Sequence, residues 1–271
     1  MFKYNFDNYK HQILSKKFER DGYIIFDLGK RKVKLNFIKK NIETITRSLL
    51  KKEKVIIKYK ENEIFNNLHK YLPKNKLNLF RMKIYNILNN KKWFLKNYFE
   101  IAKDELELIC GNELAMQRKV NLSIQYPKDD SSLLPVHSDV WSGCSPFEVV
   151  LWIPLENVYK TKSMFILKKI DNDYYYENFQ KYKDTDKLQK KIDKKIKWLK
   201  INYGQGLIFT HQLMHGNKIN KTKETRWSFN CRFKSLMSPY DKKDIAETFL
   251  PIILRPATKY GLEYEDPKTK K

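Results

Sequence analysis

The sequence predicts a mainly β protein with helices, in which an antiparallel sandwich or jelly roll follows a largely helical segment. Apolar residues recur at three- and four-residue intervals up to about Leu114, and they alternate with polar residues afterwards. Several short strand candidates separated by turn residues then follow one another, as is typical of sandwiches and jelly rolls. A length of 271 residues suits one domain with an extension.

The helical pattern extends over residues 1–114. Within it the apolar spacing predicts three helices, Leu35–Lys51, Leu77–Asn89 and Trp93–Cys110. Gly111 and Asn112 are expected to end the last of these helices. One short strand is predicted at Tyr23–Asp27. These helices either cover the back of the predicted sheet or shape the entrance to a site, and the sequence leaves both arrangements open.

The β pattern extends over residues 115–240 and is followed by a tail, 241–271. Its predicted strands are Met116–Tyr126, Phe147–Ile153, Ser163–Leu167, Lys195–Ile201, Leu207–Thr210 and Thr225–Lys234. One charged segment, residues 171–195, interrupts the strands. We expect it to be helical and to form a solvated surface excursion rather than a binding arm.

Composition limits the function classes. Hydrophobic residues make up 41% and aromatic residues 14% of the chain, enough for a sizeable core, and the formal net charge is +24. Lys outnumbers Arg 47 to 8 and is spread along the whole length. Arg is the preferred contact for phosphates and guanines. We therefore expect a solvated surface or an anionic small substrate, and not a dedicated nucleic-acid binder.

Cysteines and apolar runs indicate the cellular setting. Cys110, Cys144 and Cys231 are odd in number and widely spaced, which predicts reduced thiols rather than a disulfide framework. No stretch approaches the roughly 18 apolar residues of a membrane span, and the start MFKYNFDNYKHQ lacks a secretory apolar core. A soluble, cytoplasmic protein without membrane contact is the expectation, and no oligomeric state is predicted.

Two predicted strands carry a polar face opposite an apolar one, because side chains alternate along a strand. A solvated outer face would explain either strand alone. Two of the eight arginines lie on one of these short faces, near a histidine-rich turn, which favours the lining of a cavity. The two polar faces are Gln117, Lys119, Asn121, Ser123 and Gln125, and Arg226, Ser228, Asn230 and Arg232.

A set of possible metal ligands follows the first polar-faced strand. His137 and Asp139 form a His-x-Asp pair whose side chains point the same way, and His211 and His215 lie more than 70 residues further on. Two imidazoles and one carboxylate leave three coordination positions open, as in non-haem iron(II) oxygenases. Four-residue spacing of histidines also occurs in zinc sites. The intervening Gln-Leu-Met lacks the glutamate base of a His-Glu-x-x-His metalloprotease.

An arginine, Arg226, follows the histidine-rich turn along the chain. Arg226 lies eleven residues after His215, where a keto acid bound to iron would need a partner for its distal carboxylate. Ser228 shares the same strand face and can donate a second hydrogen bond. Asn121 and Gln125 are candidate keto-acid contacts by direction, and Trp141 is a candidate wall of the substrate site.

His137-x-Asp139, His215, and Arg226 with Ser228 together resemble the iron(II)- and 2-oxoglutarate-dependent oxygenases, nearest to the branch with the phytanoyl-CoA hydroxylases. The segments FEVVLWIPLEN, YGQGLIF and RWSFNCRFKSL are similar to members from carbohydrate and aminoglycoside biosynthesis clusters. The resemblance covers about Met116–Met237. Many relatives carry Gly-Asp where this chain has Gly204-Gln205-Gly206. Asp139 is retained, which argues against the halogenase variant.

The resemblance implies a double-stranded β-helix, a cupin-like jelly roll, with the metal at its wider mouth. It implies that iron, Fe(II), is held by His137, Asp139 and His215, because His215 precedes Gly216 and stands at the family-like distance from Arg226. His211 is then a packing residue or lies behind the ligands. The implied co-substrates are 2-oxoglutarate, anchored by Arg226, and dioxygen (O2).

The expected reaction is hydroxylation of a small polar metabolite, such as a sugar or sugar-derived intermediate, with release of succinate and carbon dioxide. Arg232 either contacts an anionic group of that substrate or forms a salt bridge inside the sheet. One alternative keeps the chemistry but acts on a protein or nucleic-acid residue. A non-catalytic jelly-roll binding protein, a metal-dependent hydrolase and a sugar isomerase are further alternatives, but none of them requires Arg226 at this position.

Overall fold

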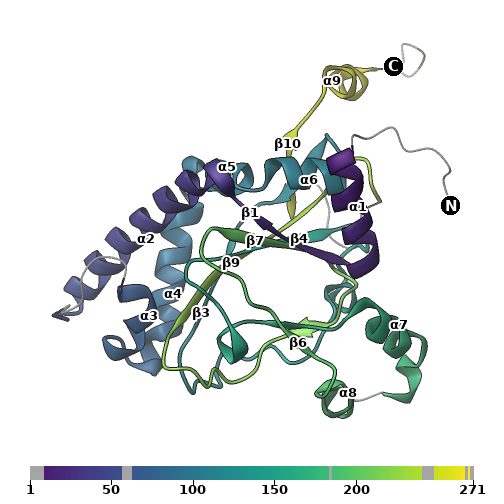
Figure 1. Cartoon of the computed structure of the whole chain (residues 1–271). Coiled ribbons are helices and arrows are strands. Elements are labelled where there is room, and N and C mark those ends of the chain that lie inside the picture. Colours follow the sequence, from purple (N-terminus) through teal and green to yellow (C-terminus); the bar gives the residue numbers. More distant parts are fainter. Residues whose placement is uncertain (1–8, 57–62, 183–184, 240–246, 266–267, 269–271) are drawn as a thin grey trace.

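Alternating sequence after residue 114 folds into antiparallel sheet, and the computed structural model shows helices packed beside it (Figure 1). It describes residues 9–56, 63–182, 185–239, 247–265 and 268, so residues 1–8 of the amino-terminal segment and residues 241–246, 266–267 and 269–271 of the predicted tail lie outside the described residues. The large sheet has the strand order β1-β7-β4-β9-β2-β10, and β3 also pairs with β9. Its strands are β1 (Tyr23–Asp27), β2 (Leu114–Gln117), β3 (Asn121–Gln125), β4 (Val149–Pro154), β7 (Gln205–Thr210), β9 (Arg226–Ser235) and β10 (Phe249–Ile253).

A second, smaller sheet faces the first. Its strands are β6 (Lys197–Trp198), β5 (Phe165–Ile166) and β8 (His215–Gly216), in that order. Side chains of the large sheet, such as Trp152 and Leu207, share a buried cluster with Met164 and Ile166 of the small-sheet region. The two sheets therefore enclose a core between them, and the predicted second histidine ligand lies on the small sheet.

Helices cover the other face of the large sheet. The alternate residues of its strands, among them Leu151 and Phe229, belong to one buried cluster with apolar residues of the helices. The Tyr98 hydroxyl, fully buried, donates to the Leu151 carbonyl at 2.7 Å. In Figure 1, α2, α4 and α5 stand together beside the sheet. The helices before β2 are α1 (Tyr9–Asp21), α2 (Lys32–Lys52), α3 (Ile64–Asn67), α4 (Lys74–Asn89), α5 (Lys92–Glu100) and α6 (Lys103–Cys110).

The strand predicted over Met116–Tyr126 is two strands, β2 and β3. Met116 lies opposite Phe233 and Asn121 opposite Asn230, so five residues along one strand span three along the other. Val120 is taken out of the ladder because the Asn89 side chain of α4 binds both its N–H, at 2.8 Å, and its C=O, at 3.0 Å. Alternation alone does not reveal such a local competitor for the backbone.

The helix predicted over Trp93–Cys110 is also two elements, α5 and α6. Ala102 has φ −129° and ψ 20°, outside the helical region, and both Ile101 and Ala102 are fully buried. The bend keeps both halves packed against the sheet. Gly111, with φ +106°, ends α6 as predicted. Among the α-helices and strands that the structure describes, the sequence analysis gave no counterpart for α1, α3, β8, β10 and α9 (Pro256–Glu263).

The charged segment, residues 171–195, is largely helical as predicted. It contains α7 (Lys169–Glu177) and α8 (Thr185–Ile192), with a 3-10 turn between them at Phe179–Lys181. It is not only a surface excursion, because Tyr175, Leu188 and Ile192 are buried with Val136 and Met214, which lie next to the predicted metal ligands.

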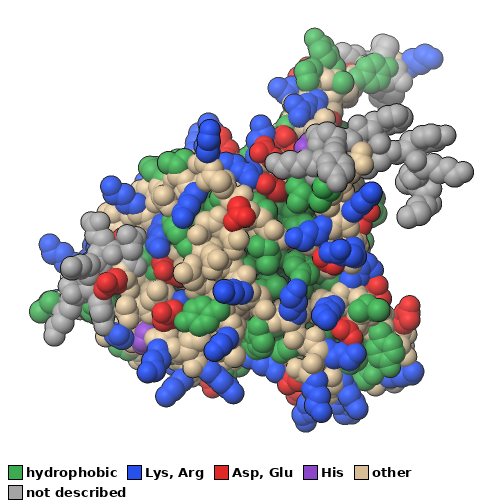
Figure 2. Space-filling model, in the orientation of Figure 1, with side chains coloured by type: hydrophobic (Ala, Val, Ile, Leu, Met, Phe, Trp, Pro, Cys, Tyr) green, Lys and Arg blue, Asp and Glu red, His purple; other side chains and the backbone are tan. Residues whose placement is uncertain are grey.

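Charge is dispersed over the visible surface. Figure 2 shows Lys and Arg side chains scattered across this face, with Asp and Glu between them, rather than gathered into one stripe. Among the described helices, none is long and apolar enough to cross a membrane. The two facing antiparallel sheets are consistent with a double-stranded β-helix.

Candidate metal centre

His137 and His215 are brought together by backbone pairing. The His137 N–H donates to the His215 carbonyl at 3.0 Å, and the His215 N–H donates back at 2.9 Å. Their rings lie 4.3 Å apart between centroids. A loop that precedes β4 is therefore fixed against the small sheet at the residue where each histidine projects.

Both imidazoles are held in the same tautomer. His137 Nδ1 lies 2.8 Å from the Pro135 carbonyl, and His215 Nδ1 lies 2.8 Å from the Leu213 carbonyl. A carbonyl only accepts, so each Nδ1 carries the proton and each Nε2 presents a lone pair. Burial and the neighbouring His137 lower the pKa of His215 to about 4, so its ring is neutral at pH 7. Neutral imidazole is the form that binds metal.

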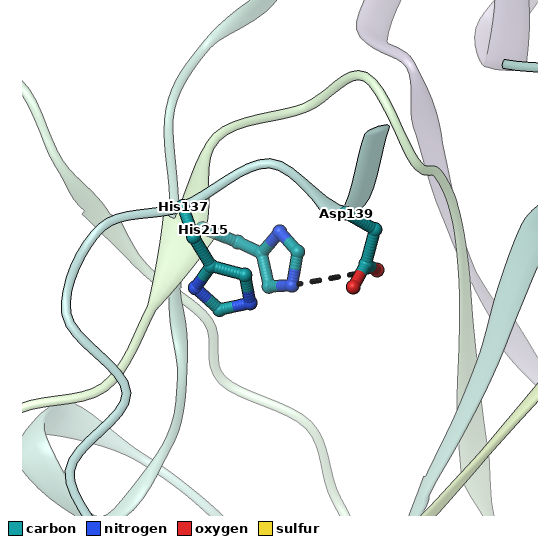
Figure 3. Close-up of side chains that lie close together, drawn as sticks. All are labelled: His137, Asp139 and His215. Carbon is teal, nitrogen blue, oxygen red and sulfur yellow. Dashed lines mark ion pairs between the residues drawn. The ribbon is translucent and has the colours of Figure 1, made fainter. Parts of the chain in front are cut away.

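Asp139 completes the group from the start of the 3-10 turn Asp139–Ser142. Its Oδ2 lies 3.9 Å from His215 Nε2, and the ligand atoms of His137, Asp139 and His215 all lie within 4.8 Å of one another (Figure 3). Two atoms 3.9 Å apart can both contact an ion at about 2.0–2.2 Å. The three side chains thus fit a single metal ion.

The carboxylate of Asp139 is kept ionised by its surroundings. Burial alone would raise its pKa, but attraction to His215 and Arg232 outweighs burial and lowers the pKa to about 2. Arg232 Nη2 donates to Asp139 Oδ1 at 2.9 Å, leaving Oδ2 toward the histidines. Arg232 thus forms a salt bridge with a candidate metal ligand on the 3-10 turn, and it also lines the cavity described next.

A cavity of about 460 Å³ opens beside the three side chains, between the two sheets. The polar face predicted for the last strand does line it, as do Asn121 and Ser123 of β3. Apolar walls come from Val150, Trp152, Met164 and Phe209, and the polar lining of β9 is Arg226, Ser228, Asn230 and Arg232. The cavity therefore joins the candidate ligands to a wall rich in hydrogen-bonding groups.

Arg226 is a buried cation on this wall, and its Nε makes no hydrogen bond in the described structure. It is only 4% exposed, and burial lowers its pKa to about 10, so it is still charged at pH 7. Nη2 donates to Ser123 Oγ at 3.1 Å, whereas Arg226 Nε and Ser228 Oγ are buried without a hydrogen bond in the described structure. Buried polar groups seldom stay unsatisfied, so these two groups fit a bound oxyanion.

Other predicted site residues lie in different settings. Asn121 lines the cavity and donates to Asn230 Oδ1 at 3.1 Å. Gln125 is fully buried, donates to the Lys218 carbonyl at 2.8 Å, and is not among the lining residues. Trp141 is 37% exposed and packs against Phe179 at 4.9 Å between ring centroids, outside the cavity lining.

His211 lies behind the candidate ligands, as the sequence analysis expected. It is fully buried, with Nε2 3.9 Å from Asp139 Oδ2 and Nδ1 3.4 Å from Glu148 Oε2. Cys144, Glu148 and His211 form a second group of potential ligand atoms within 4.8 Å of one another. Neither Cys144 nor Glu148 was predicted as a metal ligand from the sequence, because no motif spacing marks them.

The charged segment holds the loops that carry the ligands. The Tyr176 hydroxyl donates to Ser138 Oγ at 2.6 Å, Gln189 Oε1 accepts from the Val136 N–H at 2.9 Å, and Asn172 Oδ1 accepts from the Met214 N–H at 2.8 Å. Each contact is made to a residue adjacent in sequence to a candidate ligand. Sequence reasoning missed this role because only the three-dimensional structure brings the segment to the loops.

No protein-family model and no curated protein sequence matches the chain. Its fold is similar to that of a solved structure of a non-heme monooxygenase, the ThoJ–nickel complex, with 14% identity, a TM-score of 0.54, and coverage of 90% of this chain and 85% of that one. The ThoJ apo structure aligns with 14% identity and a TM-score of 0.55 over 89% of this chain and 84% of that one. At this identity the similarity shows a shared fold.

Proposed function

We propose that this chain is an iron(II)- and 2-oxoglutarate-dependent oxygenase that hydroxylates a small polar metabolite. The observation that carries the proposal is the convergence of His137, Asp139 and His215 beside Arg226. This arginine is buried and, unlike Arg232, has no carboxylate partner among the described residues. The same proposal includes the fold: the large and small sheets are the two sheets of a double-stranded β-helix, with the metal site between them.

The donor set suits iron(II). Two neutral imidazoles and one carboxylate leave adjacent positions for a chelating keto acid and for dioxygen. Held there, the metal would supply the oxygen chemistry in which substrate, 2-oxoglutarate and O2 yield hydroxylated substrate, succinate and carbon dioxide. The protein's part is to fix the ligands: the Pro135 and Leu213 carbonyls hold the imidazoles, and Arg232 holds Asp139.

Arg226 and Ser228 would hold the distal carboxylate of the keto acid. A guanidinium buried without a counterion is costly, and a carboxylate offers two acceptors in the geometry of its fork. Arg226 Nε and Ser228 Oγ are the buried donors that still lack acceptors in the described structure. A keto acid spanning from the metal to these two groups would satisfy both.

The substrate side of the cavity combines amides with apolar walls. Asn121 and Asn230 offer donors and acceptors, and Trp152 and Phe209 offer flat apolar surfaces that exclude water. Such a lining suits a polyhydroxylated molecule with polar edges and apolar faces. A sugar or sugar-derived intermediate is our proposed substrate class, and it is also the class that the sequence resemblance favours.

The proposal is tested by adding iron(II) and 2-oxoglutarate to the protein under argon. We expect the weak visible charge-transfer band of the metal–keto acid chelate, and its loss in Asp139→Ala. Absence of the band from the native protein would exclude this chelate. It would favour the alternative hypothesis of a non-catalytic jelly-roll binding protein.

The anchoring arginine gives a second, independent measurement. Arg226→Ala should weaken 2-oxoglutarate binding by about 1.5–3 kcal/mol, the range for a hydrogen bond to a charged group. Titration of the charge-transfer band gives the affinity, and Arg255→Ala, at an exposed position away from the cavity, is the matched control. Equal 2-oxoglutarate affinity in the two variants would assign the carboxylate to another residue.

A further inference from the structure

A second cleft adjoins the cavity of the candidate metal centre. It has a volume of about 640 Å³ and lies between the first turns of α4, strand β3 and the loop 131–134. Arg81, Ser123 and Leu134 line both hollows. Arg81 therefore stands at the boundary of the two hollows, within reach of a ligand in either one.

Arg81 is a charge left uncompensated at the junction. Lys74 in the cleft pairs with Asp130 at 2.6 Å, and Arg232 in the cavity pairs with Asp139 at 2.9 Å. Arg81 and Arg226 have no carboxylate partner among the described residues. Ser123, which accepts a hydrogen bond from Arg226, lines both hollows together with Arg81. If Arg226 takes the keto acid, Arg81 remains for the substrate.

The guanidinium of Arg81 is held in place by neutral groups. Nη1 donates to the Leu122 carbonyl at 3.1 Å and Nη2 donates to Asn78 Oδ1 at 2.7 Å. Two of its five N–H donors are thus used to orient the fork, and its charge is not neutralised. An arginine fixed in this way is prepared to bind an oxyanion with little further loss of side-chain freedom.

Side chains also cover the free edge of β3. Among the described strands β3 pairs only with β9, but Asn89 binds the Val120 backbone and Arg81 takes the Leu122 carbonyl on the other edge. An added peptide strand would need those groups for its ladder. The cleft therefore suits a small molecule better than a polypeptide.

We propose that this cleft binds an oxyanion of the substrate, a phosphate or a carboxylate, through Arg81, while the remainder of the substrate lies in the metal cavity. This inference rests on the proposed function, because it assigns Arg226 to the keto acid. It moves the predicted contact with a substrate anion from Arg232, which is occupied by Asp139, to a helix that the sequence motifs do not reach.

The test is calorimetry on the full chain under argon, with iron(II) and saturating 2-oxoglutarate. The probes are glycerol 3-phosphate, glycerate and glycerol, which share a carbon skeleton and differ in charge. We expect one or both anions to bind at least about tenfold more tightly than glycerol. The tighter of the two identifies the oxyanion as a phosphate or a carboxylate.

Arg81→Gln should weaken binding of the preferred anion by about tenfold to 100-fold and leave the 2-oxoglutarate titration unchanged. Lys83→Gln is the matched control, since it removes one charge from an exposed position of the same helix outside both hollows. Arg81→Lys keeps the charge without the fork and should bind with intermediate affinity, which separates recognition from misfolding.

Several results would overturn the assignment. Equal anion affinities in native protein, Arg81→Gln and Lys83→Gln would show that Arg81 does not bind the anion. The same conclusion would follow if the anions bound no more tightly than glycerol. A weaker 2-oxoglutarate titration in Arg81→Gln, with unchanged anion binding, would place Arg81 in the keto-acid site. A missing charge-transfer band in the native protein would instead contradict the proposed function, and the anion titration would still test Arg81.

Discussion

Each histidine ligand is oriented by the carbonyl two residues before it. Pro135 serves His137, Leu213 serves His215, and the histidines pair with each other through their backbones. Ring orientation, tautomer and separation are thus set by main-chain atoms, which a side-chain substitution elsewhere does not remove. A carbonyl behind each imidazole also raises its basicity as a ligand. Sequence spacing identified the candidate ligands but gave no indication of this main-chain support.

Gly216 is required beside His215 because there is no room for a side chain. An added Cβ would lie 2.7 Å from the Leu134 carbonyl oxygen and 2.9 Å from that of Pro135, which orients His137. Gly216→Ala should therefore displace the loop that carries His137. We expect at least about tenfold weaker metal binding and a stability cost of about 1–3 kcal/mol, as for other overpacked sites.

Metal titration and urea unfolding measure the two effects of Gly216→Ala. Gly261→Ala is the control, because an added Cβ there meets nothing within 4 Å in α9. Alanine in a helix should leave that protein unchanged or slightly more stable. Native-like metal affinity in Gly216→Ala would contradict the tight packing described for this loop.

At the scale of single residues, what could be predicted depended on periodicity and spacing. Arg226 and Ser228 face the cavity because alternation persists along β9. Alternation failed for Gln125, whose amide turns to the Lys218 carbonyl at the end of β3. Arg81 could not be predicted as a residue that lines the cavity. Its helix was recognised from its apolar residues, and the sequence does not indicate which polar residue of that helix faces the cavity.

At the scale of elements, the predicted strands and helices were right in kind, but two of them are interrupted where tertiary contacts override the local pattern. Tyr23–Asp27 agrees with β1 residue for residue. The breaks at Val120 and at Ala102 arise from an Asn89 side chain and from burial of a bend, both set by tertiary contacts. Local sequence propensity does not predict either break, because both depend on residues distant in the chain.

The charged segment illustrates the same limit and leads to a prediction. Asn172 is 3% exposed and accepts from the Met214 N–H, next to His215. Asn172→Ala leaves that N–H without an acceptor, which should cost about 1–3 kcal/mol and loosen the β8 ligand. We expect several-fold weaker metal binding, measured by titration at a temperature where the variant is fully folded.

Asp173→Ala is the control for Asn172→Ala. It lies next in the same helix, but its side chain is half exposed and pairs only with Lys169 at the surface among the described residues. Such a pair contributes little to stability. Loss of stability in Asn172→Ala with native metal affinity would show that the segment supports the fold alone and does not position the ligands.

At the scale of the whole molecule, the candidate metal site joins parts that are distant in the chain. His137 and Asp139 lie on a loop before β4, and His215 lies on the small sheet. A ligand that binds only the folded state stabilises it by about 2.7 kcal/mol at a concentration 100 times its dissociation constant. For a protein of this size that corresponds to a rise in melting temperature of roughly 5–10 °C.

We therefore expect manganese(II) with 2-oxoglutarate to raise the melting temperature, and a chelator to reverse the rise. 2-Oxoglutarate without metal should give a much smaller rise, because Arg226 then holds only one end of the keto acid. In Asp139→Ala the metal should have little effect. An undiminished rise in Asp139→Ala would move the metal to another site. Among the described residues the candidate is the group of Cys144, Glu148 and His211, because its His211 Nε2 lies 3.9 Å from Asp139 Oδ2.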